Sequence, residues 1–193
     1  MATSGKRPCR YAELHALSNF TFLRGASHPE ELVETAAKLG YEALAITDEC
    51  SMSGVVRAHS AAKEYGLRKL IIGTELKLPS GRKLVLLAQS RNGYAALCQL
   101  ITNTRRAAKK GDYELTRAAF ESGLPDCLAL WVPDQTFTLD VEDHWLRETF
   151  RDRLWISVVL LADGRQPEQH AKQRAEGRRF RLARVAGGDV DMQ

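Results

Sequence analysis

Long apolar segments are the first feature that this sequence lacks. Within its 193 residues, no stretch approaches the roughly 18 consecutive apolar residues that a helix needs to cross a bilayer. The first ten residues, MATSGKRPCR, carry charge but no apolar segment behind it, so no secretory signal is expected either. Both absences favour a cytoplasmic protein without a membrane partner.

Paired cysteines and the common catalytic motifs are also absent. The four cysteines, at positions 9, 50, 98 and 127, lie far apart and form no Cys-x-x-Cys pair, so we expect reduced thiols and no disulfide framework. The sequence contains no GxSxG turn, no P-loop, no GxGxxG after a strand and no HExxH. The usual signals for serine hydrolases, nucleotide-binding enzymes and zinc proteases are therefore missing.

The excess of positive charge is small and unevenly placed. Lys and Arg number 28 against 24 Asp and Glu, which gives a formal net charge of +4. Basic residues gather between Arg105 and Lys110 and again between Arg165 and Arg184. Patches of this kind contact nucleic-acid phosphates in some proteins, whereas a solvated helix face explains many others. Both interpretations stay open at this point.

What the sequence does contain is a repeated alternation of short apolar strands and amphipathic helices. The pattern predicts strands at 11–14, 43–47, 69–74, 84–88, 127–132, 154–161 and 182–186, and helices at 27–40, 54–65, 92–106, 141–150 and 166–179. Strands followed by helices favour an α/β fold, with a parallel sheet covered by helices as an open sheet or a barrel. We expect residues 1–10 to be flexible and residues 11–193 to form one domain.

Potential metal ligands follow four of the predicted strands: His15, then Asp48 with Glu49, then Glu75, and finally Asp189 with Asp191. Because the carboxyl ends of parallel strands meet at one face, these side chains are expected to lie together. An imidazole and several carboxylates suit Zn²⁺, Mn²⁺ or Mg²⁺, which activate water for phosphoester hydrolysis. The alternative is structural: strand-end acids often accept hydrogen bonds from the following helix or loop, and a lone histidine is often a packed, hydrogen-bonded residue.

Several ordered motifs along the chain match a known family. The segment from Tyr11 to Leu67 contains LSNFTFLRGAS, ITDE and GVVRAH, and the match continues through KLVLLAQSRNGYAALCQLIT, DCLALWVP and GGDVDMQ. These segments resemble the opening of bacterial C-family DNA polymerase α subunits, most closely the error-prone branch. The resemblance implies a PHP (polymerase and histidinol phosphatase) domain, which is a distorted βα barrel of parallel strands and outer helices with a metal cluster at the strand ends.

Some positions of the family's metal cluster keep a ligand in this sequence. The first imidazole of the opening His-x-His motif is kept as His15, and the glutamate that ends the third strand is kept as Glu75. The Thr-Asp-His motif ends on Glu49, so a carboxylate replaces an imidazole. The closing Asp-x-His motif reads Asp189-Val-Asp191, with its aspartate kept and its histidine replaced.

Other positions of the cluster have lost their ligand. The second imidazole of the opening motif is Leu17, and the cysteine or histidine expected after LALWV is Pro133. Arg24 occupies the place of an acid, and Lys83 that of the histidine that opens the LVLLA strand. These two cations would repel divalent ions by several kcal/mol before screening.

The loss of ligands predicts a degenerate metal site with a structural role. Arg24 and Lys83 are placed to pair with Glu75, Glu49 or Asp189, so that a network of salt bridges would hold the barrel face together. No cofactor is then expected. Residual binding of Zn²⁺, Mn²⁺ or Mg²⁺ remains the alternative, and it would make the chain a metal-dependent phosphoesterase with His15, Glu75 and Asp189 as ligands.

The resemblance also implies that this chain is related to DNA polymerases. It does not imply that the chain itself catalyses nucleotide addition. Nucleotide addition in the family uses carboxylate-bound Mg²⁺ in a palm region that has no counterpart here. We therefore expect a truncated N-terminal PHP module, incomplete at its C-terminus, of an error-prone DNA polymerase. Its family role is DNA replication and repair by damage tolerance, with DNA bound through the full-length polymerase.

Two further expectations follow from this interpretation. A barrel that lacks its last βα unit exposes strand edges, so the isolated chain is expected to be marginally stable or prone to aggregate. The third function class is a non-catalytic interaction module that binds mutagenesis-complex or replication-clamp proteins.

Overall fold

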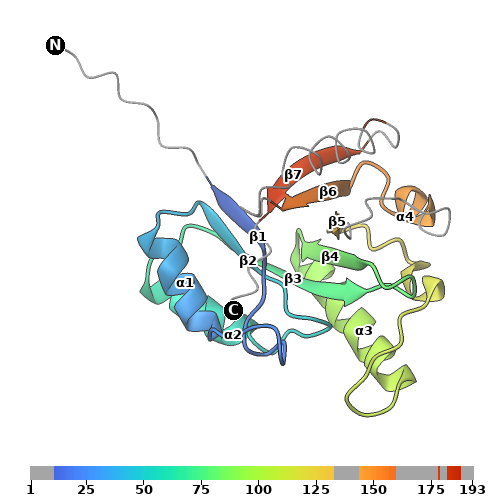
Figure 1. Cartoon of the computed structure of the whole chain (residues 1–193), viewed down its shortest axis with the longest axis horizontal. Coiled ribbons are helices and arrows are strands. Elements are labelled where there is room, and N and C mark those ends of the chain that lie inside the picture. The colour runs from blue at the N-terminus through green and yellow to red at the C-terminus, as the bar shows by residue number, and fades with distance from the viewer. Residues whose placement is uncertain (1–10, 133–143, 160–177, 179–181, 188–193) are drawn as a thin grey trace, which may run out of the picture.

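Seven strands in chain order form one curved sheet in the computed structural model of this protein, which describes residues 11–132, 144–159, 178 and 182–187 (Figure 1). The strands are β1 (Ala12–Ala16), β2 (Ala43–Ile46), β3 (Leu70–Lys77), β4 (Lys83–Ala88), β5 (Cys127–Val132), β6 (Leu154–Val159) and β7 (Ala183–Gly187). Strands β1 and β7, at the two edges of the sheet, approach one another without a recorded backbone pairing among the described residues. The sheet is thus an incomplete barrel, as expected from the sequence.

One prediction about the sheet is wrong, because its strands are not all parallel. Strands β1, β2 and β3 run parallel, as do β5, β6 and β7, but β4 is antiparallel to both of its neighbours. The physical reason is the short connection between β3 and β4. The Leu78 amide donates to the Arg82 carbonyl at 2.7 Å across the Pro-Ser-Gly turn, and a turn this short joins only antiparallel strands.

The helices lie on the outside of the sheet, as the sequence pattern predicts. Those in the described residues are α1 (Pro29–Lys38), α2 (Val55–Glu64), α3 (Arg91–Ala107) and α4 (His144–Thr149), with a 3₁₀ turn at Arg117–Phe120 that the sequence did not indicate. The helix expected at 166–179 lies, except for residue 178, outside the described residues. Helix α1 begins at Pro29, two residues later than the expected range: His28 is its N-cap, and the Glu31 carboxylate accepts from the His28 amide at 2.7 Å. None of the helices within the described ranges combines the length and apolar character of a membrane span.

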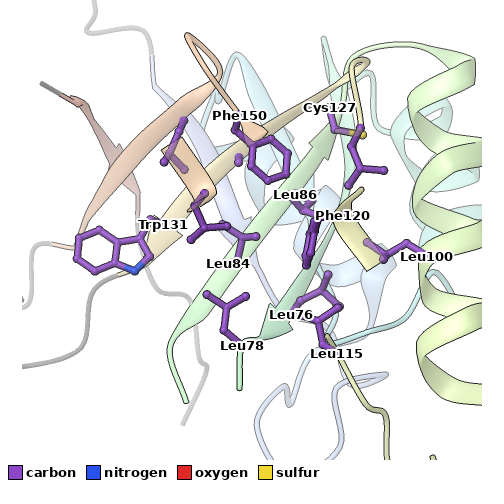
Figure 2. Packing of buried hydrophobic residues seen from close by; sticks show 14 of the residues in the cluster. Leu76, Leu78, Leu84, Leu86, Leu100, Leu115, Phe120, Cys127, Trp131 and Phe150 are labelled. Carbon is purple, nitrogen blue, oxygen red and sulfur yellow. The ribbon is translucent and has the colours of Figure 1, made fainter. Parts of the chain in front are cut away.

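Alternating side chains of the strands separate the apolar core into distinct clusters. Leu84 and Leu86 of β4 face outward, where they pack with residues of β3, β5 and α3 (Figure 2). Val85 and Leu87 face inward, where they pack inside the barrel with residues from all six of the remaining strands. A third cluster joins β1 and β2 to α1 and α2. Because successive side chains of a strand point to opposite faces, this alternation determines which strand residues face into the barrel. The barrel mouth is the edge of the sheet at which β1, β2 and β3 end.

Antiparallel β4 has a direct consequence for the barrel mouth. Lys83 is the first residue of β4, and it pairs in register with Lys77 at the end of β3. In a parallel sheet the first residue of β4 would lie at the edge opposite the ends of β1, β2 and β3. Because β4 runs the other way, Lys83 lies at the same edge as those ends.

Candidate functional site

Glu75 is the centre of a charged cluster at the barrel mouth. Its side chain is 1 % exposed and lies within β3, beyond the strand end at Thr74 that the sequence indicated. His15 of β1 contacts Glu75 through Nε2, which lies 2.8 Å from Oε2 of the carboxylate. Nζ of Lys83 lies 3.7 Å from the same oxygen. Two neighbouring parts of the sheet, β1 and β4, therefore direct a polar and a charged group at one buried carboxylate of β3.

Arg24 connects this carboxylate to a second one. Its Nη1 donates to Oε2 of Glu49 at 2.9 Å and also to Oε1 of Glu75, while Nη2 donates to Oε2 of Glu75 at 3.2 Å. The paired contacts with Glu75 have the fork geometry that makes arginine–carboxylate bonds strong and directional. The Arg24 side chain is 24 % exposed, so the pair is only partly screened by water.

The surroundings of Glu75 determine its protonation state. Burial on its own raises the pKa of this carboxyl group. Hydrogen bonds from His15 and Arg24, together with the positive charge of Lys83, outweigh burial and hold the pKa at about 2. Glu75 is consequently ionised at neutral pH, and its charge is balanced by cations of the same chain.

The loop that carries Arg24 is anchored by Asp48, directly after β2. Oδ1 of Asp48 accepts from the Ser18 amide at 2.7 Å and from the Thr21 hydroxyl at 2.8 Å, and Oδ2 accepts from the Ser18 hydroxyl at 2.7 Å. A Cβ on Gly25 would lie 2.0 Å from the Ser18 carbonyl oxygen, so the loop closes only with glycine there. Asp48 thus accepts hydrogen bonds from a loop, which is the structural role considered above for acids at strand ends.

Two residues contact the charged cluster or its loop without having been predicted to do so: Tyr113, which carried no signal in the sequence, and Arg105, which was noted only as part of a basic patch. The Tyr113 hydroxyl donates to Oε1 of Glu49 at 2.9 Å and accepts from the Lys77 amide at 2.8 Å. Arg105 donates from Nε to the Cys50 carbonyl at 2.8 Å, and its guanidinium lies 5.9 Å from the centre of the Tyr113 ring. Tyr113 follows Glu49 by 64 residues in an irregular segment, where strand and helix periodicity give no information.

The structure brings together five of the positions singled out from the sequence: His15, Arg24, Glu49, Glu75 and Lys83. Leu17 is buried, 1 % exposed, just after β1. Pro133, Asp189 and Asp191 lie outside the described residues. Within the described part of the chain, no group of three or more His, Cys, Asp and Glu side chains is arranged to hold a metal ion.

A family model matches most of the chain. The model described as the PHP domain matches residues 13–158. The chain belongs to the PHP family. The match spans β1 to β6, and so includes every described residue of the charged cluster at the PHP barrel mouth.

Named relatives of this PHP chain are long DNA polymerases. The error-prone DNA polymerase of Methylococcus capsulatus is 52 % identical over 183 residues, and the alignment covers 94 % of this chain but 17 % of the polymerase. The error-prone DNA polymerase of Pseudomonas aeruginosa is 49 % identical over 186 residues, covering 96 % of this chain and 18 % of the polymerase. The chain therefore spans less than a fifth of the length of the curated relatives it matches.

Solved structures with the same fold are much more distant in sequence. A putative metal-dependent phosphoesterase from Bifidobacterium adolescentis superposes with a TM-score of 0.62 at 18 % identity, covering 95 % of this chain and 88 % of that one. An amidohydrolase from Chromobacterium violaceum, solved with bound sulfate and no metal, superposes with a TM-score of 0.65 at 16 % identity, covering 93 % and 87 %. At such identities the likeness establishes the fold alone.

Proposed function

We propose that residues 11–193 act as the PHP module of an error-prone C-family DNA polymerase, and that ion pairs replace metal ions at its barrel mouth. The single observation that carries the second part is the position of Arg24, whose guanidinium bridges the carboxylates of Glu49 and Glu75. The first part is supported by about 50 % identity to error-prone polymerases along nearly the whole chain.

The residues at the mouth do not fit a multinuclear metal centre. Divalent ions need imidazole nitrogens and carboxylate oxygens that point into a shared space. Here Nε2 of His15 is engaged by Glu75 at 2.8 Å, and both oxygens of Glu75 are contacted by Arg24. A cation bound there would also lie beside two positive side chains, which costs several kcal/mol before screening.

The role that remains for the cluster is structural. His15 of β1, Glu75 of β3 and Lys83 of β4 belong to separate strands, and Arg24 belongs to the loop after β1. Their mutual contacts hold the strands at the mouth in one arrangement without an external ligand. In this proposal, nucleotide addition belongs to the larger part of the relatives that the chain does not span.

The cellular setting follows from kinship with those polymerases. We place the module in the cytoplasm, where a bacterial polymerase meets the chromosome, in DNA replication and repair by damage tolerance. Contact with template DNA then depends on the longer polymerase, and mutagenesis-complex or clamp proteins are its expected partners. The names of the relatives support the polymerase relationship and specify no protein partner.

A metal-dependent phosphoesterase is the second candidate function. The observation that favours it is that an imidazole and a buried carboxylate, His15 and Glu75, lie together in a fold shared with a putative metal-dependent phosphoesterase. A phosphoesterase assay with Mn²⁺ or Zn²⁺ distinguishes the two candidates. Metal-dependent turnover that disappears in Glu75→Gln would establish the second candidate and overturn the first.

A graft tests the proposed function directly. This chain would replace the matching residues of the Methylococcus capsulatus polymerase, and primer extension would be measured beside the unmodified polymerase and beside this chain alone. We expect extension by the graft at a rate close to that of the unmodified enzyme, and none by the isolated chain. A folded graft without extension, or extension by the isolated chain, contradicts the proposal.

A further inference from the structure

A hollow of about 850 Å³ lies beside the charged cluster, between the end of β3, the end of α3 and residues 111–117. Its lining includes Glu49, which it shares with the cluster, and Tyr113, whose side chain forms part of its wall. None of the roles proposed above uses this hollow. The last turn of α3 carries Arg105 and Arg106, with which the first basic patch of the sequence begins.

Cations dominate the surface in and around the hollow. Lys77, Arg105 and Arg117 line it, and the exposed residues Arg106, Lys109 and Lys110 adjoin Arg105 at the end of α3 and in the turn that follows. Two lining acids that oppose them are Asp112 and Glu114, which are also exposed. Glu49, the remaining acid of the lining, already accepts from Arg24 and from Tyr113. The lining itself carries three cations and three acids, so the net positive charge of this surface comes from Arg106, Lys109 and Lys110 beside the hollow.

Contacts within the chain hold two of the side chains that line the hollow in place. Arg105 is exposed, yet its Nε is held by the Cys50 carbonyl at 2.8 Å, and its guanidinium lies over the Tyr113 ring. Tyr113 is itself fixed at its hydroxyl, between the Lys77 amide and Glu49. A side chain that is already ordered loses little entropy on binding an anion. This distinguishes the surface from an ordinary solvated helix face.

We propose that this surface binds the phosphate backbone of single-stranded DNA. Several cations on neighbouring elements suit a polyanion better than a single phosphate. A duplex is a wide, stiff rod that meets a recess only at its rim, whereas a single strand bends into a positive groove. The choice of DNA over RNA rests on the proposed function, since the named relatives are DNA polymerases.

The test is fluorescence anisotropy with a labelled oligothymidylate and the full chain, titrated at several salt concentrations. The patch variant is Lys109→Glu/Lys110→Glu, and the control is Lys63→Glu/Lys69→Glu, which changes the charge equally at exposed positions on α2 and just before β3. We expect the patch variant to lose about tenfold or more in affinity and to show a shallower salt slope, because it lacks two phosphate contacts. The control should stay within about threefold of the wild type.

Three outcomes overturn the inference: no binding at low salt, equal losses in both variants, or tighter binding of a duplex of the same length. A circular dichroism spectrum and a melting curve for each variant separate loss of binding from loss of fold. If Lys109→Glu/Lys110→Glu is unfolded, Arg117→Glu provides the second test with the same expected direction. The assay involves neither metal nor nucleotide addition, so its failure leaves the ion-pair account and the graft experiment untouched.

Discussion

At the barrel mouth, cations from two distant parts of the chain approach the same buried carboxylate. Arg24 comes from the loop after β1 and Lys83 from the start of β4, yet both contact Glu75. The identities of these residues are visible in the sequence, and their opposite charges predict that they pair. The hydrogen-bond partners of Asp48 and Tyr113 could not be predicted, because loop geometry rather than periodicity determines these bonds.

Replacing Arg24 tests the strength of this pairing. Arg24→Ala leaves the buried carboxylate of Glu75 without its forked partner, so we expect the free energy of unfolding to fall by about 2–4 kcal/mol. The control is Arg57→Ala, which removes an exposed pair with Glu30 and should cost less than about 1 kcal/mol. Urea unfolding of both variants measures the difference, and equal losses would show that the Arg24 bridge adds nothing.

The lowered pKa of Glu75 predicts a dependence of stability on pH. The carboxyl group titrates near 4.5 when unfolded and at about 2 when folded, so the unfolded chain binds the proton more readily. The stability that Glu75 contributes is therefore fully present above pH 4.5 and is lost as the pH falls toward 2.

The measurement is urea unfolding of wild type and Glu75→Gln between pH 6 and pH 2.5. The wild type should lose up to about 3 kcal/mol more than the variant over this interval. Parallel curves for the two proteins would mean that Glu75 has an ordinary pKa in the folded chain.

Among the elements, the connection between β3 and β4 shows where sequence reasoning failed and what followed. The strands on either side of the Pro-Ser-Gly turn were expected to run parallel, as their neighbours do, and they are antiparallel. Most of the other elements were predicted within a few residues, because apolar spacing of two or of three to four specifies them. The direction of a strand depends on the length of its connection, which here permits only an antiparallel hairpin.

The loop at Ser18–Gly25 depends on one residue of another element. Asp48→Ala removes the acceptor of three buried hydrogen bonds from this loop, so we expect a loss of about 3 kcal/mol or more in unfolding free energy. Trypsin should also cut the native variant faster after Arg24. Asp112→Ala, at an exposed position, is the matched control. An unchanged rate of cleavage would show that the loop holds its shape without Asp48.

At the scale of the whole molecule, the resemblance predicted the PHP fold and its incomplete barrel more firmly than any single pattern did. Periodicity alone left an open sheet and a barrel equally possible. The inward cluster, with side chains from all seven strands, decides for a barrel-like curvature. Spacing could not show this, because curvature arises from packing between residues far apart in the chain.

In the part of the chain that the structure describes, no strand pairing closes the sheet between β1 and β7, and this predicts the behaviour of the isolated chain. Exposed strand edges offer free backbone groups to other chains, so we expect self-association or a melting temperature below about 50 °C. Analytical ultracentrifugation together with differential scanning calorimetry measures both properties. A monomer with a cooperative transition well above that temperature would show that the seven strands suffice for a stable domain.

The metal content of the purified chain after incubation with metal ions is the most direct test of the proposal that ion pairs replace metal ions at the barrel mouth. The purified chain would be equilibrated with excess Mn²⁺ or Zn²⁺, freed of unbound ions, and measured by inductively coupled plasma mass spectrometry beside Arg24→Asp/Lys83→His, which restores two ligand types. We predict far less than one ion per wild-type chain, an unchanged melting curve with EDTA, and a higher metal content in the double variant. Two or three ions per wild-type chain, lost in Glu75→Gln, would contradict the proposal.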